Sequence, residues 1–182
     1  RWGVLFQGGA LFSTLTVAEN IQVPLREYYP RLPASLLDEI AAYKVVMSGL
    51  PADAGPKYPA EISGGMRKRA GLARALAMSP EIVLYDEPTT GIDPIMGDII
   101  NELIVALRDR LKVTSVVVTH DMRSAYKVAD RIAMLYNGSI IEVGAPDEIR
   151  NSRNPVVRQF VEGSAVGPPM RVFRASTPYC VA

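Results

Sequence analysis

Two acidic residues in succession, Asp86 and Glu87, directly follow the apolar run Ile82 to Tyr85. Such a run is typical of a central parallel strand that is covered on both faces. Because α/β proteins bind ligands at the carboxyl ends of such strands, we expect both carboxylates at that edge. One carboxylate can hold Mg²⁺ while the other orients an attacking water, and phosphoryl transfer needs both functions. By themselves, the two acids also suit a solvated or capping role.

Other polar residues suited to phosphate chemistry occur at predicted element ends. Ser63-Gly64-Gly65 begins a helix, where backbone N–H groups and the positive end of the helix dipole favour an anion, although an ordinary helix cap is the alternative. His120, the single histidine, follows a β-branched strand and can donate to a phosphate oxygen or have a structural role. Gln7 ends another strand and faces the same sheet edge or solvent. Asp93 closes a turn, where a helix N-cap is a sufficient role.

Alternating strands and helices must position these residues. Thr16 and Glu19 form a capping box at the start of a helix that Pro24 must end or kink. Strands are predicted over Val4–Phe6, Ile82–Tyr85 and Thr114–Thr119, and a hairpin over Arg131–Tyr136 and Ser139–Val143 turns on Asn137-Gly138. Further helices are predicted over Ala34–Leu50, Met66–Met78, Pro94–Leu111, Asp121–Val128, Asp147–Asn151 and Pro155–Glu162, with a loop over Pro51–Pro59 and an extended tail from Ser164. Strands and helices joined by short links are typical of a parallel α/β sheet.

Composition excludes several classes of protein. The 182 residues are 48% hydrophobic and 21% charged, which predicts a globular core rather than disorder. No apolar run approaches the roughly 20 residues of a membrane span. The formal net charge of +1 argues against a nucleic-acid partner, which needs a basic face. Cys180 is the single cysteine, so an internal disulfide is excluded and a reducing compartment is favoured.

Five segments in a fixed order resemble the motifs of an ABC-transporter ATPase. They are Gln7 (Q-loop), Ile62–Met66 (signature), Ile82–Pro88 (Walker B), Gly91–Asp93 (D-loop) and Thr119–Asp121 (H-loop). Five motifs in order are far more specific than one. The resemblance covers residues 1 to about 162 and implies part of a P-loop NTPase fold, with a parallel core sheet and an inserted helical subdomain.

The resemblance implies a role for each candidate residue, with ATP and Mg²⁺ as cofactors. Asp86 organises Mg²⁺, Gln7 binds near it, Glu87 polarises the attacking water and His120 contacts the γ-phosphate. Two such subunits sandwich two nucleotides, so Ser63, Gly64 and Gly65 grip the nucleotide held by the other subunit and Asp93 couples the two sites.

One motif of the family is absent from the 182 residues. They contain no G-x-x-x-x-G-K-[ST] loop, whose amides and lysine cradle the phosphates. We therefore expect the chain to be inactive alone. The lack of an initiator Met and a start that runs directly into a predicted strand, with no signal peptide, lead us to expect an amino-terminal truncation. Within residues 1–163, the resemblance predicts a helical subdomain over 8–78 and a RecA-like part over 79–163, followed by a tail over 164–182.

Three stretches resemble the ATPases of Mla/Mce-type lipid transport systems: Gln7–Phe12, the Met66–Arg69 segment and Val156–Phe160. Core packing of Met66 and a solvated helix face over Arg67–Arg69 are the alternative explanation. The likeness implies a homodimeric motor at the cytoplasmic face of the bacterial inner membrane, a membrane permease subunit and a small regulatory subunit. It also predicts that Met170, Val172 and Phe173 are buried where the tail crosses the dimer, with disorder of this segment as the alternative.

Other functions stay open at this point. The same motor can serve an amino acid, metal or lipoprotein cargo, and an incomplete cassette can supply its signature motif in trans without catalysis. A soluble ABC protein of translation or DNA repair fits less well, because those proteins usually pair two cassettes in one chain or insert a coiled coil.

Overall fold

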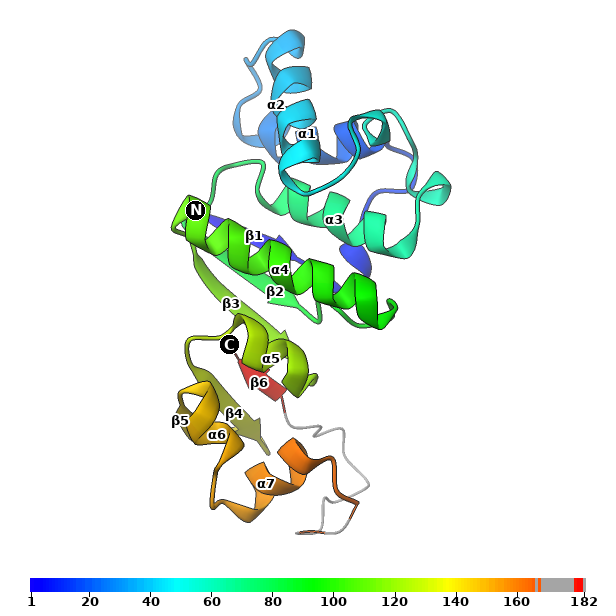
Figure 1. Ribbon diagram of the computed structural model, residues 1–182. Helices are drawn as coiled ribbons and strands as arrows, with labels where there is room; N and C mark the ends of the chain where they lie inside the picture. The colour runs from blue at the N-terminus through cyan, green and yellow to red at the C-terminus, as the bar shows by residue number, and fades with distance from the viewer. Residues whose placement is uncertain (166, 168–178, 182) are drawn as a thin grey trace. The chain divides into compact units, whose positions relative to one another are not determined.

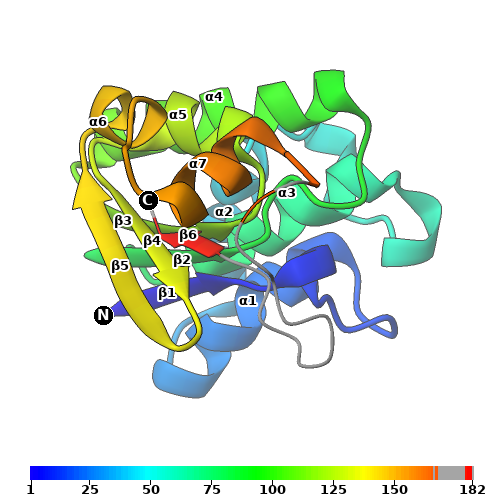
Figure 2. The ribbon, with the colours of Figure 1, turned by 90° about the horizontal axis from the view of Figure 1, so that it is seen from below.

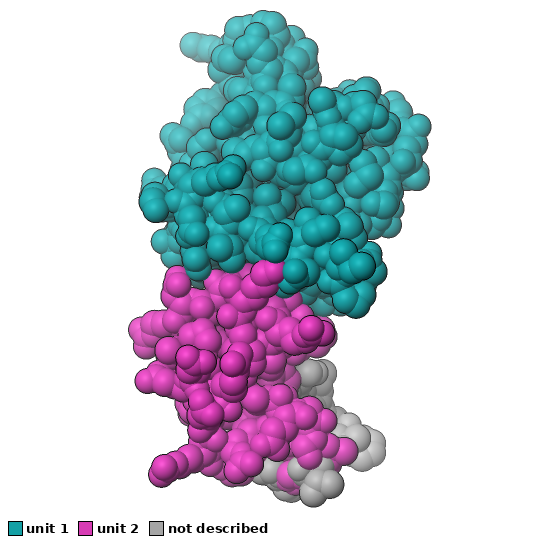
Figure 3. All heavy atoms as spheres, in the orientation of Figure 1, with its two compact units in different colours: residues 1–116 teal, residues 117–182 magenta. Residues whose placement is uncertain are grey.

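The computed structural model describes residues 1–165, 167 and 179–181. These residues form two compact units, residues 1–116 and residues 117–182 (Figure 3). We describe each unit by itself. The predicted division at residue 78 into a helical subdomain and a RecA-like part stays a prediction.

Three helices build the larger core of the first unit: α1 (Val17–Tyr28), α2 (Ala34–Met47) and α3 (Gly64–Ala75) (Figure 1). The predicted capping box of α1 is confirmed, because the Thr16 amide donates to Glu19 Oε2 at 2.8 Å and the Glu19 amide donates to Thr16 Oγ1 at 3.2 Å. Of the two effects predicted for Pro24, an end of the helix is excluded, since α1 continues to Tyr28, whereas a kink stays a prediction. Packing on the core outweighs the single backbone hydrogen bond that a proline removes.

The helix α2 buries only some of its apolar residues. Leu37, Ala41 and Val45 are buried at intervals of four residues. Tyr43 and Val46 are 65% and 59% exposed. The helix also ends at Met47 rather than Leu50.

Two parallel strands support the helices of this unit. β1 (Trp2–Leu5) pairs with β2 (Ile82–Asp86), and Leu5 lies opposite Tyr85. The helix α3 packs closely on the chain after β1, the 3-10 turn η1 (Gln7–Gly9). The remaining elements are the short 3-10 turns η2 (Ala52–Ala54) and η3 (Pro59–Glu61), within the predicted loop region, and the long helix α4 (Pro94–Leu111).

The second unit follows the predicted order of elements. It contains the end of β3 (Thr114–Thr119), then α5 (Met122–Val128), β4 (Ile132–Tyr136), β5 (Ser139–Gly144), α6 (Pro146–Arg150), α7 (Pro155–Glu162) and β6 (Tyr179–Val181). Its core contains Ala125, Ile132, Met134, Ile149 and Val157. Figure 2 shows β4 and β5 side by side as a hairpin, with Tyr136 opposite Ser139. Asn137 and Gly138 have φ of 48° and 77°, as a type I′ turn requires.

The end of the chain departs from the predicted extended tail. β6 pairs antiparallel with the end of β3, where Thr119 lies opposite Cys180, and with β4, where Ala133 lies opposite Val181. Met170, Val172 and Phe173, which we expected to be buried across a dimer, lie outside the described residues. None of the described helices has the length and apolar character to span a membrane.

Candidate functional site

The structure brings Gln7, Asp86 and Glu87 to one edge of the parallel strand pair. Leu5 and Tyr85 are register partners, so the residues that follow them leave β1 and β2 side by side. Asp86 is the last residue of β2 and is exposed, and Gln7 is exposed in the turn η1. The predicted meeting of these polar residues at the carboxyl ends of the strands is therefore observed.

Glu87 has an unusual backbone and a defined side-chain partner. Its φ is 48°, in the left-handed region that a residue with a Cβ seldom occupies, and the residue is only 6% exposed. Thr90 Oγ1 donates to Glu87 Oε2 at 2.7 Å, and the Thr90 amide donates to the Glu87 carbonyl at 3.3 Å. Backbone strain of this kind clusters at functional sites, where the surrounding structure must hold it in place.

Lys68 is a residue of this site that the sequence analysis missed. Its side chain is buried, and its Nζ donates to the backbone carbonyl of Glu87 at 3.0 Å. Burial lowers the pKa of Lys68, and the charge of Glu87 opposes that shift. The solvated-face explanation of Arg67–Arg69 is wrong for this lysine. Helical spacing was the sequence signal for the burial of Lys68, because Lys68 follows the buried Gly65 by three residues and precedes the buried Leu72 by four.

The start of α3 lies beside the start of α4. Ser63 caps α3, with its Oγ accepting from the Met66 amide at 3.2 Å, and Asp93 caps α4 by accepting from the Met96 amide at 2.9 Å. A Cβ on Gly65 would lie 2.8 Å from Cε of Met96. The predicted phosphate-binding turn and Asp93 are thus neighbours in the first unit, and both also have the capping roles considered as alternatives.

His120 is exposed and follows β3 directly, as predicted. The next residue, Asp121, caps α5 by accepting from the Arg123 amide at 3.1 Å and the Ser124 amide at 3.3 Å. His120 belongs to the second unit, whereas Asp86 and Glu87 belong to the first. That His120 shares their sheet edge stays a prediction.

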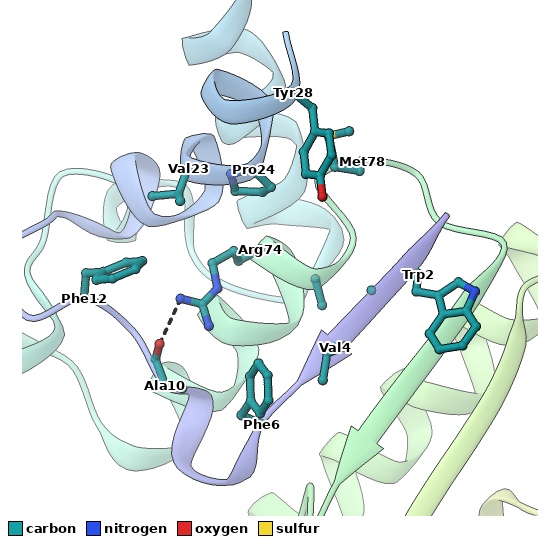
Figure 4. Close-up of a pocket in the computed structure, with 12 residues that line it drawn as sticks. Trp2, Val4, Phe6, Ala10, Phe12, Val23, Pro24, Tyr28, Arg74 and Met78 are labelled. Carbon is teal, nitrogen blue, oxygen red and sulfur yellow. Dashed lines mark hydrogen bonds between the residues drawn. The ribbon is translucent and has the colours of Figure 1, made fainter. Parts of the chain in front are cut away.

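An open apolar groove of about 420 Å³ lies beside β1 in the first unit. Figure 4 shows Phe6, Phe12, Tyr28 and Arg74 around it, with a hydrogen bond from Arg74 to the carbonyl of Ala10 at 2.8 Å. The Arg74 guanidinium also lies 5.9 Å from the ring centre of Phe12. The exposed rings of Phe6, Phe12 and Tyr28 give this groove an apolar surface.

Comparison with known proteins shows which family this chain resembles. The ABC transporter family matches residues 1–90. The chain is 41% identical over 168 residues to the intermembrane phospholipid transport system ATP-binding protein MlaF of Escherichia coli, covering 92% of this chain and 62% of MlaF. The chain is therefore similar to ATP-binding proteins of ABC transporters. It resembles, at 41% identity over 167 residues, the probable ribonucleotide transport ATP-binding protein mkl of Mycobacterium tuberculosis, covering 92% of this chain and 46% of mkl.

Solved ABC structures confirm the predicted α/β cassette fold. The ATP-binding cassette MJ0796, solved as a dimer in a post-hydrolysis state bound to ADP and Pi, matches with a TM-score of 0.72 and 32% identity, covering 80% of this chain and 63% of that one. The predicted resemblance to ABC ATPases, and to the phospholipid transport ATPases of Mla-type systems, is confirmed. The chain spans about half to just under two thirds of the length of the relatives and structures described here.

Proposed function

We propose that the full-length protein is the ATP-hydrolysing motor subunit of an ABC transporter that moves phospholipid across the cell envelope. The acidic pair at the end of β2, which lies beside Gln7 and is tied to α3 through Lys68, is the observation that carries this proposal. The similarity to MlaF over 92% of the chain supports the phospholipid cargo.

Mg²⁺ fits the donors at this edge. The described residues contain no group of three or more His, Cys, Asp or Glu side chains able to hold a metal ion. Magnesium does not need such a cage, since it binds through one or two carboxylates together with waters and substrate phosphates. The exposed carboxylate of Asp86 and the amide oxygen of Gln7 would hold it, and the ion would supply charge stabilisation to the transferred phosphoryl group.

ATP fits only in part, because residues 1–182 contain no phosphate-cradling G-x-x-x-x-G-K-[ST] loop. The groups present suit the terminal phosphate and the attacking water. Glu87 would orient that water, and His120 would donate to a γ-phosphate oxygen. Ser63 Oγ accepts from the Met66 amide, which leaves its hydroxyl hydrogen available for a phosphate oxygen.

Partners of the proposed motor follow from the incomplete site. Ser63–Gly65 would contact the nucleotide of a second copy, and Asp93 beside them would couple the two sites. The dimeric form of MJ0796 supports this arrangement. The apolar groove of Figure 4 would receive a helix of the membrane subunit. The motor would then lie at the cytoplasmic face of the inner membrane. A small regulatory subunit is a further expected partner.

A second cargo has specific support, because mkl is named as a probable ribonucleotide transport protein at the same 41% identity. The two cargoes are separated by measuring ATP hydrolysis in the complex with its membrane subunits. Stimulation by phospholipid vesicles supports phospholipid transport, whereas stimulation by ribonucleotides alone supports the other cargo.

Glu87→Gln in the full-length protein tests the catalytic role. The amide retains the size of the side chain but cannot take a proton from water, so we expect hydrolysis to be nearly abolished and ATP to hold a closed dimer. Glu81→Gln, at the exposed start of the same strand region, is the matched control and should behave as wild type. ATP turnover by malachite-green assay and dimer mass by light scattering are the measurements. Substantial turnover by Glu87→Gln would remove Glu87 as the base.

A further inference from the structure

Lys68 joins two parts of the proposed motor that the sequence separates by 19 residues. It lies on α3, five residues after the Ser63 cap, and its Nζ contacts the carbonyl of Glu87. The helix that presents Ser63–Gly65 to a second subunit is thereby bonded to the proposed base of its own subunit.

The environment of Lys68 shows that this contact is specific. The side chain is 4% exposed, and burial of an ammonium group is unfavourable unless a polar partner compensates. A bond of 3.0 Å from a charged donor to a backbone carbonyl is such compensation. Lys68 is also close enough to Glu87 for the carboxylate charge to act on its pKa.

The acceptor of the Lys68 hydrogen bond is the carbonyl of Glu87, a residue whose backbone conformation is unfavourable. Glu87 has φ of 48°, and the next residue is Pro88, which by itself restricts the preceding residue towards extended backbone. A conformation disfavoured in this way persists only when neighbouring groups determine it. Lys68 holds the backbone of Glu87 from one side, and Thr90 holds its carboxylate at 2.7 Å.

We propose that Lys68 is a positioning residue that fixes the orientation of the Glu87 carboxylate for the attacking water. This inference rests on the proposed function and extends it to a residue outside the five motifs. It follows that loss of the Lys68 donor slows the chemical step while leaving nucleotide binding nearly unchanged, because Lys68 contacts the base rather than the phosphate-binding turn.

The test uses the full-length protein and three lysine variants. Lys68→Met keeps the length of the side chain without a donor, and Lys68→Arg keeps a charged donor. We expect Lys68→Met to lower kcat by about tenfold or more with the KM for ATP within about twofold, and Lys68→Arg to recover a large part of kcat. Lys44→Met is the matched control, because Lys44 is also buried in this unit but its hydrogen bond, 3.4 Å to Ser79 Oγ, lies away from the site.

A second readout does not depend on catalysis. Hydrogen exchange of the segment 86–91, measured by mass spectrometry, should become faster in Lys68→Met and stay unchanged in Lys44→Met. A kcat of Lys68→Met within twofold of wild type, or equal losses of kcat in both Met variants, would overturn the positioning role. If the wild type hydrolyses no ATP, the proposed function fails, and the exchange rates then decide the role of Lys68: unchanged exchange refutes it.

Discussion

At the scale of single residues, two neighbouring carboxylates of this site differ in burial and in hydrogen bonding. The pair Asp86-Glu87 has the right types for magnesium binding and water activation, but the two residues have different environments. Asp86 is exposed, whereas Glu87 is buried and held by Thr90 and Lys68. An exposed carboxylate suits an ion that keeps several waters, and a restrained one suits the alignment of a single water.

Tyr85, immediately before the acidic pair, gives a pH-dependent prediction. Burial raises the pKa of Tyr85 to about 12, against about 10 in the unfolded chain. Below pH 10 the phenol is neutral in both states and its contribution to stability is complete. Between pH 10 and 12 the unfolded state loses its proton first, so the free energy of unfolding falls as pH rises.

We therefore expect wild type to lose about 1 kcal/mol more than Tyr85→Phe between pH 9 and pH 11. Urea unfolding followed by far-UV circular dichroism measures the difference. Tyr43→Phe is the control, because it removes the hydroxyl of a tyrosine that is 65% exposed. If the free energy of unfolding depends on pH equally in wild type and Tyr85→Phe, the prediction is contradicted.

At the scale of elements, the close approach of α3 to the chain after β1 positions the site. A Cβ on Gly71 would lie 2.8 Å from both Cα and O of Gly9 and 3.0 Å from Cδ1 of Leu5. Two of these three atoms belong to backbone, so they cannot move aside cheaply. This contact holds the helix that contains Lys68 against the turn that contains Gln7.

Gly71→Ala should therefore destabilise the protein by about 1–3 kcal/mol through overpacking, although alanine is the better helix former. Gly97→Ala on α4 is the matched substitution, because its Cβ would meet Thr89 at an ordinary 3.6 Å. That variant should be as stable as wild type or up to about 1 kcal/mol more stable. Chemical denaturation measures the free energy of unfolding of both variants. Equal values would show that α3 does not need a glycine at position 71.

At the scale of the whole molecule, the residues proposed to bind nucleotide come from different parts of the chain. Gln7, Ser63–Gly65, Asp86, Glu87 and Asp93 belong to the first unit and His120 to the second, and the phosphate-cradling loop of the family is not among the 182 residues. Each of these groups would then supply only a small part of the binding free energy of the triphosphate.

Residues 1–182 alone should consequently bind ATP·Mg²⁺ more weakly than the micromolar range, because a loop of backbone amides and a lysine supplies much of the phosphate affinity in P-loop proteins. Isothermal titration calorimetry of residues 1–182 measures this, with the full-length protein as the positive control. Micromolar affinity of residues 1–182 would show that the residues present suffice.

Local features followed from the sequence by itself. The capping box of Thr16 and Glu19, the Asp93 cap of α4 and the Asn137-Gly138 hairpin were all predicted and are all present. Each depends on residues within about four positions of one another, so short-range sterics and hydrogen bonding determine it. The acidic edge was predictable as well, because buried parallel strands end at a common edge.

Only the tertiary structure decided the features that depend on distant partners. Pro24 stays inside α1, and Tyr43 and Val46 point to solvent, because packing between helices selects which apolar residues are buried. The pairing of β6 joins residues about 60 apart. Lys68 is buried and Glu87 adopts positive φ because α3 and the end of β2 meet, 19 residues apart in sequence. Helical spacing from Gly65 and Leu72 indicates which face of α3 holds Lys68, but only the fold supplies its acceptor, the carbonyl of Glu87.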